Sequence, residues 1–255
     1  MRTALVRTIS PQFADALVQQ PTPRRPVYAD AVTQHAAYAR ALQDAGLTLR
    51  WLGEGETHID GCFVEDQAVV CGNTALVTRC GAPRRRAEAL SIARTLTDLD
   101  LDVHHMAGPA SCDGGDVLTL GRYIFVGRSS RTNAEGVKAL RQVFEPVGYS
   151  IVEVDVHDAL HLKCHCTALA DDAVLTVPGF IDKRVFDGIA EVLFASPAEA
   201  YAANVLRVGD TVLIADGYPG VRATVLERGL TPLALPMQEL ALADGSLTCL
   251  SILIS

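Results

Sequence analysis

The sequence lacks the features that would place it among membrane, secreted or nucleic-acid-binding proteins. No apolar run approaches the roughly 20 residues that a membrane-spanning helix needs. The N-terminal stretch MRTALVRTIS has no apolar segment of the kind found in signal peptides, so we expect no secretory leader. Basic residues are in the minority: 22 Lys and Arg against 30 Asp and Glu give a formal net charge of −8. A protein that binds nucleic acid needs a basic face for the phosphates. We therefore expect neither a membrane nor a nucleic acid as a partner.

A disulfide framework is also missing. The seven cysteines are odd in number and do not have the spacing of a secreted disulfide scaffold. Disulfides are rare in the reducing cytosol, so we expect free thiols and a cytoplasmic protein. No linker or low-complexity segment divides the chain, and 49% of its residues are hydrophobic. We expect one domain over residues 1–255 with a large core.

The sequence does contain a repeated pattern of two short apolar runs followed by a helix-like run. Four units cover residues 61–99, 114–148, 166–195 and 202–230, and the helix-like run of the third unit is IDKRVFDGIAEVLFA (181–195). The fifth combines the C-terminal TCLSILI with the N-terminal TALVRTI and the helix-like YADAVTQHAAYARALQDAG. Gly, Asp and Asn between the paired runs indicate hairpins. Five units whose last strand meets the first predict a closed α/β ring, with strands inside, helices outside and a central cavity.

One proline-rich stretch stands apart from these units. Residues Gln19–Pro26 (QQPTPRRP) contain three prolines and two arginines, which predicts a loop. Such a loop is either a mobile lid or a plain surface connection, and its composition fits both.

Cys249 lies in DGSLTCLSILI, after a turn-like Asp244–Ser246 and at the start of the terminal apolar strand. A buried structural thiol is the common role of such a residue. A nucleophilic cysteine needs an acid or base partner and surroundings that favour the thiolate. His161, in DALHLKCHCTAL, is a candidate partner, because strand alternation places His161, Lys163 and His165 on one face. At this point both roles of the thiol stay open.

A zinc site is the alternative for Cys164, His165 and Cys166. Two cysteines at i and i+2 do not have the usual zinc spacing, and no second pair appears. We therefore expect no metal.

Acidic residues recur near the first strand of two units. Asp60, Glu65 and Asp66 lie in DGCFVED, and Asp113 and Asp116 in SCDGGDVL. Carboxylates that point into one cavity repel each other unless a cation joins them, whereas turn acids cap backbone N–H groups. The cap is favoured for Asp116, and both roles stay open for Asp66 and Asp113. Glycines after Asp113 would allow a strained turn that aims its carboxylate inward.

Arg85 and Arg131 each lie at the start of a helix-like run. An arginine there opposes the helix dipole, which is reasonable if it receives a carboxylate ligand in a bidentate pair. The alternative is a solvated surface side chain.

Seven segments, in order, resemble those of the dimethylarginine dimethylaminohydrolases of the pentein, or amidinotransferase, superfamily. They are FVEDQAVVC (63–71), TRCGAPRRR (78–86), CDGGD (112–116), SSRTNAEG (129–136), HLK (161–163), YAANVL (201–206) and DGSLTCLSILI (244–254). The resemblance runs along essentially the whole chain. It implies a five-bladed α/β propeller of ββαβ-type repeats with a central active site. It also implies hydrolysis of N-omega-methylated arginines to L-citrulline and dimethylamine or methylamine, without a cofactor.

The resemblance also implies a role for each candidate at the reacting end. Cys249 matches the nucleophile, which would form a covalent thiouronium intermediate, and His161 matches the general acid/base. Asp113 and Asp66 match the acids that clamp the guanidinium. Asp60 and Glu65 match further contacts on the guanidinium side.

At the amino-acid end, Arg85 and Arg131 match the residues that hold the α-carboxylate. Leu17 and Ala243 fall where the family uses backbone carbonyls for the α-amino group, and Leu17 would move with the lid. Exposed edges between units make a homodimer plausible.

The sequence departs from the family pattern in two places. Arg79-Cys80-Gly81 replaces the common R-P-G, which changes a turn residue rather than a proposed catalyst. The acid at Asp113 is Glu in some members. Two alternatives stay open: arginine deiminase or amidinotransferase activity on the same scaffold, and a binder of cationic amino acids without catalysis.

Overall fold

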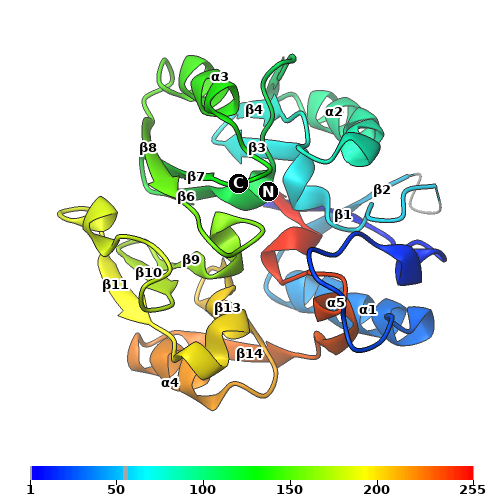
Figure 1. The fold of residues 1–255 in the computed structure, drawn as a ribbon, viewed down its shortest axis with the longest axis vertical. Helices are drawn as coiled ribbons and strands as arrows, with labels where there is room; N and C mark the ends of the chain where they lie inside the picture. Colours follow the sequence, from blue (N-terminus) through cyan, green and yellow to red (C-terminus); the bar gives the residue numbers. More distant parts are fainter. Residues whose placement is uncertain (1, 54–56, 255) are drawn as a thin grey trace.

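Five small sheets arranged around a central axis form the protein (Figure 1). The computed structural model describes residues 2–53 and 57–254. Each sheet has three strands: the first two pair antiparallel, and the third lies parallel to the second. This arrangement confirms the predicted five-unit α/β propeller.

The sheets are built from strands of three to six residues. They consist of β15 (Ile252–Ile254), β1 (Thr3–Arg7) and β2 (Thr48–Leu52); β3 (Ala68–Cys71), β4 (Thr74–Val77) and β5 (Asp102–His105); β6 (Val117–Leu120), β7 (Tyr123–Arg128) and β8 (Ser150–Asp155); β9 (Cys166–Ala170), β10 (Ala173–Thr176) and β11 (Glu191–Phe194); and β12 (Leu206–Val208), β13 (Thr211–Ala215) and β14 (Thr231–Leu235).

Helices cover the outside of the ring (Figure 1). In four units a helix connects the second strand to the third: α1 (Tyr28–Asp44), α2 (Ala89–Asp98), α3 (Ala134–Phe144) and α4 (Pro219–Glu227). A short α5 (Gln238–Ala241) follows β14. The start of α3 shows how the sequence sets these boundaries, because the side chain of Asn133 accepts the Gly136 N–H at 2.8 Å as an N-cap. No helix in the described ranges is long and apolar enough to cross a membrane.

The third unit differs from its prediction. A helix over residues 181–195 is wrong: this segment forms a 3-10 turn η6 (Lys183–Phe186) and then β11. Gly188 between them has φ of +72°, in the left-handed region that an α-helix cannot contain. Residues 191–194 pair with β10 instead, as the corresponding third strand does in every unit. The repeat pattern had not separated these third strands from the helix-like runs.

The termini close the ring. β15 pairs antiparallel with β1, with Thr3 opposite Ile254 and Leu5 opposite Ile252. Figure 1 shows the two ends of the chain side by side near the axis. The prediction that the last strand meets the first is confirmed.

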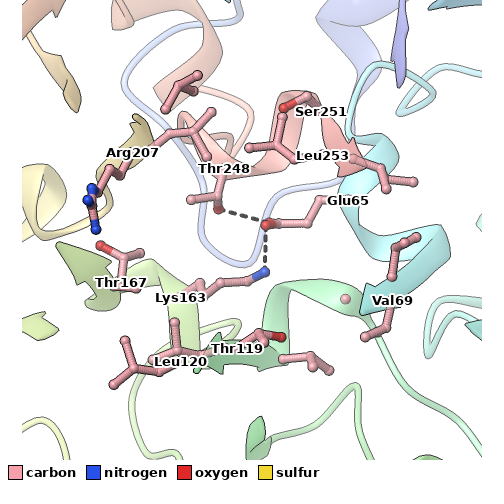
Figure 2. A pocket seen from close by; sticks show the side chains of 18 of the residues that line it. Glu65, Val69, Thr119, Leu120, Lys163, Thr167, Arg207, Thr248, Ser251 and Leu253 are labelled. Atoms are coloured by element: carbon pink, nitrogen blue, oxygen red, sulfur yellow. Dashed lines mark hydrogen bonds and ion pairs between the residues drawn. The ribbon is translucent and has the colours of Figure 1, made fainter. Parts of the chain in front are cut away.

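The first strands of the units surround a central channel of about 500 Å³. Each unit contributes to its wall: Val69 of β3, Thr119 of β6, Thr167 of β9, Arg207 of β12 and Leu253 of β15 (Figure 2). The predicted central cavity is therefore present, and strand faces form most of its wall.

Candidate active site

A short 3-10 turn precedes the first strand of every unit, and we name these the lead-in turns. They are η2 (Val64–Gln67), η4 (Gly114–Asp116), η5 (Leu162–Cys164), η7 (Pro197–Ala203) and η8 (Thr248–Leu250). Contacts join η2 to η4 and η8, and η4 to η5. Asp66, Asp113, His161 and Cys249 lie in or directly beside four of these turns. The repeat thus brings four distant segments together at one end of the ring.

A cavity of about 30 Å³ lies where the turns meet. Eight of the ten predicted site residues line it: Leu17, Asp60, Asp66, Arg85, Arg131, His161, Ala243 and Cys249. Asp113 lies behind His161, to which it is hydrogen-bonded. A cavity of this size holds about one water molecule, so a larger ligand requires side chains or a loop to move.

His161 does not belong to a strand. It is the N-cap of η5, and β9 begins only at Cys166. The predicted shared face of His161, Lys163 and His165 is therefore wrong, because a 3-10 turn does not alternate. The ring of His165 instead has its Nδ1 3.1 Å from the carbonyl of Ala200.

Carboxylates surround the His161 ring. Its Nε2 lies 3.0 Å from Oδ2 of Asp113 and 3.9 Å from Oδ1 of Asp66. Burial favours the neutral imidazole, but Asp66, Asp113 and Asp116 outweigh it and raise the pKa of His161 to about 9. At neutral pH this residue carries a proton that it can donate.

Cys249 is half-buried in η8, immediately before β15. Burial and the nearby carboxylates of Glu65 and Asp66 raise the pKa of its thiol well above the usual range. The thiol is therefore neutral in the empty site. A cation bound between thiol and carboxylates would reverse this effect and favour the thiolate.

Asp66 is buried and held from two sides. Nη1 of Arg85 lies 2.6 Å from its Oδ2, and the Gly115 N–H donates to its Oδ1 at 3.1 Å. Arg85 is itself buried, and it also pairs with Glu88 at 2.9 Å. Thus Arg85, predicted to meet a substrate carboxylate, is engaged with protein carboxylates here.

Asp113 is fully buried and accepts three hydrogen bonds besides its contact with the thiol of Cys80. The Gly81 N–H donates to Oδ1 at 2.7 Å, and Arg131 Nη1 and His161 Nε2 approach Oδ2 at 3.2 and 3.0 Å. Burial opposes ionisation, but the hydrogen bond and charge of His161 lower the pKa of Asp113 well below its usual range. This carboxylate is a permanent negative charge in the site.

The two glycines after Asp113 are needed for space. A Cβ on Gly114 would lie 2.0 Å from the Glu65 carbonyl oxygen, and one on Gly115 would lie 2.5 Å from Nδ1 of His161. Neither has a positive φ, so the predicted strained turn is not the reason for the glycines. Their absent side chains let η2, η4 and η5 pack closely.

The N-terminal loop reaches the cavity through Asp60. The Leu17 N–H donates to Asp60 Oδ1 at 2.7 Å, and Arg84 Nη2 lies 2.8 Å from Oδ2. Ala243, 2% exposed, faces the same cavity. Residues Gln19–Pro26 contain no helix or strand, as predicted for a loop.

Glu65 points away from this cavity and into the end of the channel. Its Oε1 pairs with Lys163 Nζ at 2.6 Å, and its Oε2 accepts a hydrogen bond from Thr248 Oγ1 at 2.8 Å (Figure 2). The adjacent Asp66 faces the cavity. The contact predicted between Glu65 and a guanidinium stays a prediction that this placement does not favour.

Three further residues line the cavity: Phe63, Leu160 and Asp244. Asp244 accepts the Gln19 N–H at 2.6 Å and has a φ of +55°, which is unusual for a residue with a side chain. Its Asp-Gly-Ser context indicated only a turn. No local pattern separates Phe63 or Leu160 from ordinary core residues.

Asp66, Asp113 and His161 form the one cluster of potential metal ligands found in the described ranges, with ligand atoms within 4.8 Å of one another. Cys164, His165 and Cys166 do not form such a group there. The same two carboxylates also fit a planar guanidinium, whose N–H groups donate charge-assisted hydrogen bonds to carboxylate oxygens.

Comparisons with known proteins agree on one family. A family profile described as "N,N dimethylarginine dimethylhydrolase, eukaryotic" matches residues 14–194. The chain is 36% identical over 251 residues to the N(G),N(G)-dimethylarginine dimethylaminohydrolase of Streptomyces coelicolor, covering 98% of this chain and 96% of that one. It is 31% identical to the enzyme of the same name from Pseudomonas aeruginosa, covering 89% and 90%.

Solved structures place the fold in the same group. DDAH from Pseudomonas aeruginosa, as a cysteine-to-serine mutant complexed with citrulline, superposes with a TM-score of 0.94 at 30% identity, covering 99% of this chain and 98% of that one. The N-terminal domain of a cyanobacterial arginine dihydrolase, ArgZ, shares the fold with a TM-score of 0.89 at 15% identity, covering 100% and 97%. The chain belongs to the dimethylarginine dimethylaminohydrolase family of the pentein superfamily.

Proposed function

We propose that this chain hydrolyses asymmetric dimethylarginine and monomethylarginine to L-citrulline, with release of dimethylamine or methylamine. The observation that carries the proposal is the convergence of the Cys249 thiol, the His161 imidazole and the Asp66 carboxylate on one cavity, with Asp113 hydrogen-bonded to that imidazole. The names of relatives at 31–36% identity, and the citrulline in the related structure, support this substrate and product.

In the proposed mechanism, Asp66 and Asp113 hold the guanidinium planar and cationic, which keeps its central carbon electrophilic. Preorganised carboxylates in a buried site stabilise such a cation more than water does. In the empty site Arg131 occupies a carboxylate oxygen of Asp113. A bound guanidinium would take over that contact and release Arg131 toward the substrate's own carboxylate.

Covalent catalysis then uses Cys249 and His161. The bound cation favours the thiolate, which attacks the guanidinium carbon to give a tetrahedral adduct. His161, protonated in the empty site, donates its proton to the departing amine and leaves a thiouronium on Cys249. The neutral imidazole next activates water, and hydrolysis releases citrulline.

We also propose the partner, the domain organisation, the cellular location and the oligomeric state. A small methylated arginine is the partner, residues 1–255 work as one catalytic domain, and the protein is cytoplasmic and homodimeric. Free thiols at all seven cysteines agree with a reducing compartment.

Mass spectrometry after mixing with asymmetric dimethylarginine tests the proposal. We expect citrulline, dimethylamine and a transient adduct on Cys249. Cys249→Ser should form neither citrulline nor the adduct while still binding substrate. Ammonia released from plain arginine in preference to dimethylamine would favour a deiminase, and turnover by Cys249→Ser equal to the wild type would exclude the covalent mechanism.

A further inference from the structure

Four of the five lead-in turns supply a predicted catalytic or binding residue. The fifth, η7, supplies none, and Asn204 is its C-cap. Asn204 is only 2% exposed and does not line the site cavity. Its amide nevertheless contacts both η5, which follows His161, and η8, which contains Cys249.

The Asn204 side chain joins two of those turns. Its Nδ2 donates to the backbone carbonyl of Lys163 at 2.7 Å and to Oγ1 of Thr248 at 3.0 Å. Its Oδ1 accepts the Thr248 N–H at 3.1 Å. Thr248 directly precedes Cys249, and Lys163 follows His161 by two positions. One buried amide therefore links the two segments that carry the nucleophile and the acid/base.

Glu65 closes these contacts into a cycle of hydrogen bonds. It accepts from Lys163 Nζ at 2.6 Å through one carboxylate oxygen and from Thr248 Oγ1 at 2.8 Å through the other (Figure 2). The hydrogen-bond cycle thus runs from Asn204 to Thr248, Glu65, Lys163 and back to Asn204. Lead-in turns of four units take part in it. Buried polar networks in which each member is satisfied hold their parts rigidly.

We propose that Asn204 is a positioning residue that sets the separation between Cys249 and His161, with Glu65 and Thr248 completing its support. The inference rests on the proposed function. The turns η5 and η8 are each a three-residue 3-10 segment, so few hydrogen bonds of their own fix their places. A displacement of about 1 Å from the reactive geometry can lower a rate roughly 100-fold.

The contacts predict a specific kinetic effect. The hydrogen bonds of the Asn204 side chain go to Lys163 and Thr248, not to Leu17, Arg131 or Ala243, which line the cavity and are predicted to hold the amino-acid end of the substrate. Its loss should therefore disturb the reacting atoms more than substrate binding. We expect Asn204→Ala to lower kcat about 10- to 100-fold and to change KM less than about threefold.

Thr167→Val is the matched control. Thr167 is buried next to the same segment, where its hydroxyl donates to the Ala203 carbonyl at 2.7 Å and accepts the Val205 N–H at 3.1 Å. The variant loses the hydrogen bonds to Ala203 and Val205, which flank Asn204, but keeps every hydrogen bond of the cycle formed by Asn204, Thr248, Glu65 and Lys163. It should lower the melting temperature as Asn204→Ala does, yet keep kcat within about twofold of the wild type.

A second variant covers the case in which Asn204→Ala does not fold. Thr248→Val removes the hydroxyl that joins Asn204 to Glu65 but keeps the backbone bond to Asn204. We expect a kcat about 3- to 10-fold lower, with KM nearly unchanged. Wild-type kcat in the folded variants, or an equal loss of kcat in Thr167→Val, would overturn the positioning role. Absence of citrulline from the wild type would instead overturn the proposed function itself.

Discussion

Protein cations contact both carboxylates that lie beside His161 in the empty site. Arg85 pairs with Asp66, while Arg131 and the imidazolium of His161 both contact Asp113. Protein cations thus occupy the carboxylates that we propose for the substrate guanidinium. Buried unpaired carboxylates would be costly, so these pairs keep the site stable until a cationic substrate replaces one of them.

The raised pKa of His161 predicts a pH dependence. His161 is protonated below about pH 9 in the free enzyme, so kcat/KM should fall as the pH rises through about 9. The stabilisation that its charged form contributes is complete below the unfolded pKa of about 6.5 and is lost as the pH rises through the folded value.

Asp113→Asn tests this cause directly. Removing one carboxylate should lower the His161 pKa, and NMR titration of the imidazole measures this without turnover. Asp102→Asn is the control, because this exposed residue pairs with His104 and is not among the groups that shift His161. An unchanged His161 pKa in Asp113→Asn would contradict the electrostatic account.

At the level of elements, carboxylates hold the N-terminal loop over the cavity. Asp60 and Asp244 accept the N–H groups of Leu17 and Gln19. Glu239, at the start of α5, accepts the Val27 N–H at 2.8 Å and pairs with Arg24. The loop is thus fixed at both ends, and substrate entry into the small cavity requires it or its neighbours to move.

Releasing the far end of the loop should affect binding. Glu239→Ala removes the contacts to Arg24 and Val27, and we expect faster tryptic cleavage after Arg24 and a KM raised about two- to tenfold. Glu135→Ala, which removes an exposed helical acid that pairs with Lys138, should change neither. Cleavage rates and KM equal to the wild type in Glu239→Ala would show that this contact does not hold the loop.

For the whole molecule, ring closure is the decisive event. The last strand pairs with the first, and Ile252 and Ile254 of β15 are buried in the core with Leu5 and Val64. These few residues join the two ends of the chain. Because Cys249 lies three residues before β15, the proposed nucleophile reaches its place only when the ring closes.

Weakening the closing strand should therefore destabilise the entire domain. Ile252→Ala should cost about 2–4 kcal/mol, since Ile252 is 5% exposed. Leu226→Ala on α4, where the side chain is 48% exposed, should change the unfolding free energy by less than about 0.5 kcal/mol. Denaturant unfolding measures both, and equal costs would argue against a closing role for β15.

Several features of this protein follow from sequence patterns alone. The repeat of paired apolar runs predicts the five units and the meeting of the termini, because each unit must bury its strands against neighbours. The repeat also puts Asp66 and Asp113 at similar positions of their units, near the first strand, so a closed ring directs both toward its centre. The roles expected for His161 and Cys249 came from the resemblance to the family. The helix expected over residues 181–195 fails at Gly188, where a left-handed residue ends the turn and a third strand finds a partner in β10.

Only the tertiary structure decided what each of these side chains contacts. Glu65 and Asp66 are neighbours in sequence, yet one faces the channel and the other the cavity, because Lys163 and Thr248 from distant units attract the first and Arg85 the second. Asn204 has no local signal at all. Its three hydrogen bonds exist because ring closure places η5 and η8 on either side of it, and no pattern within one unit contains that information.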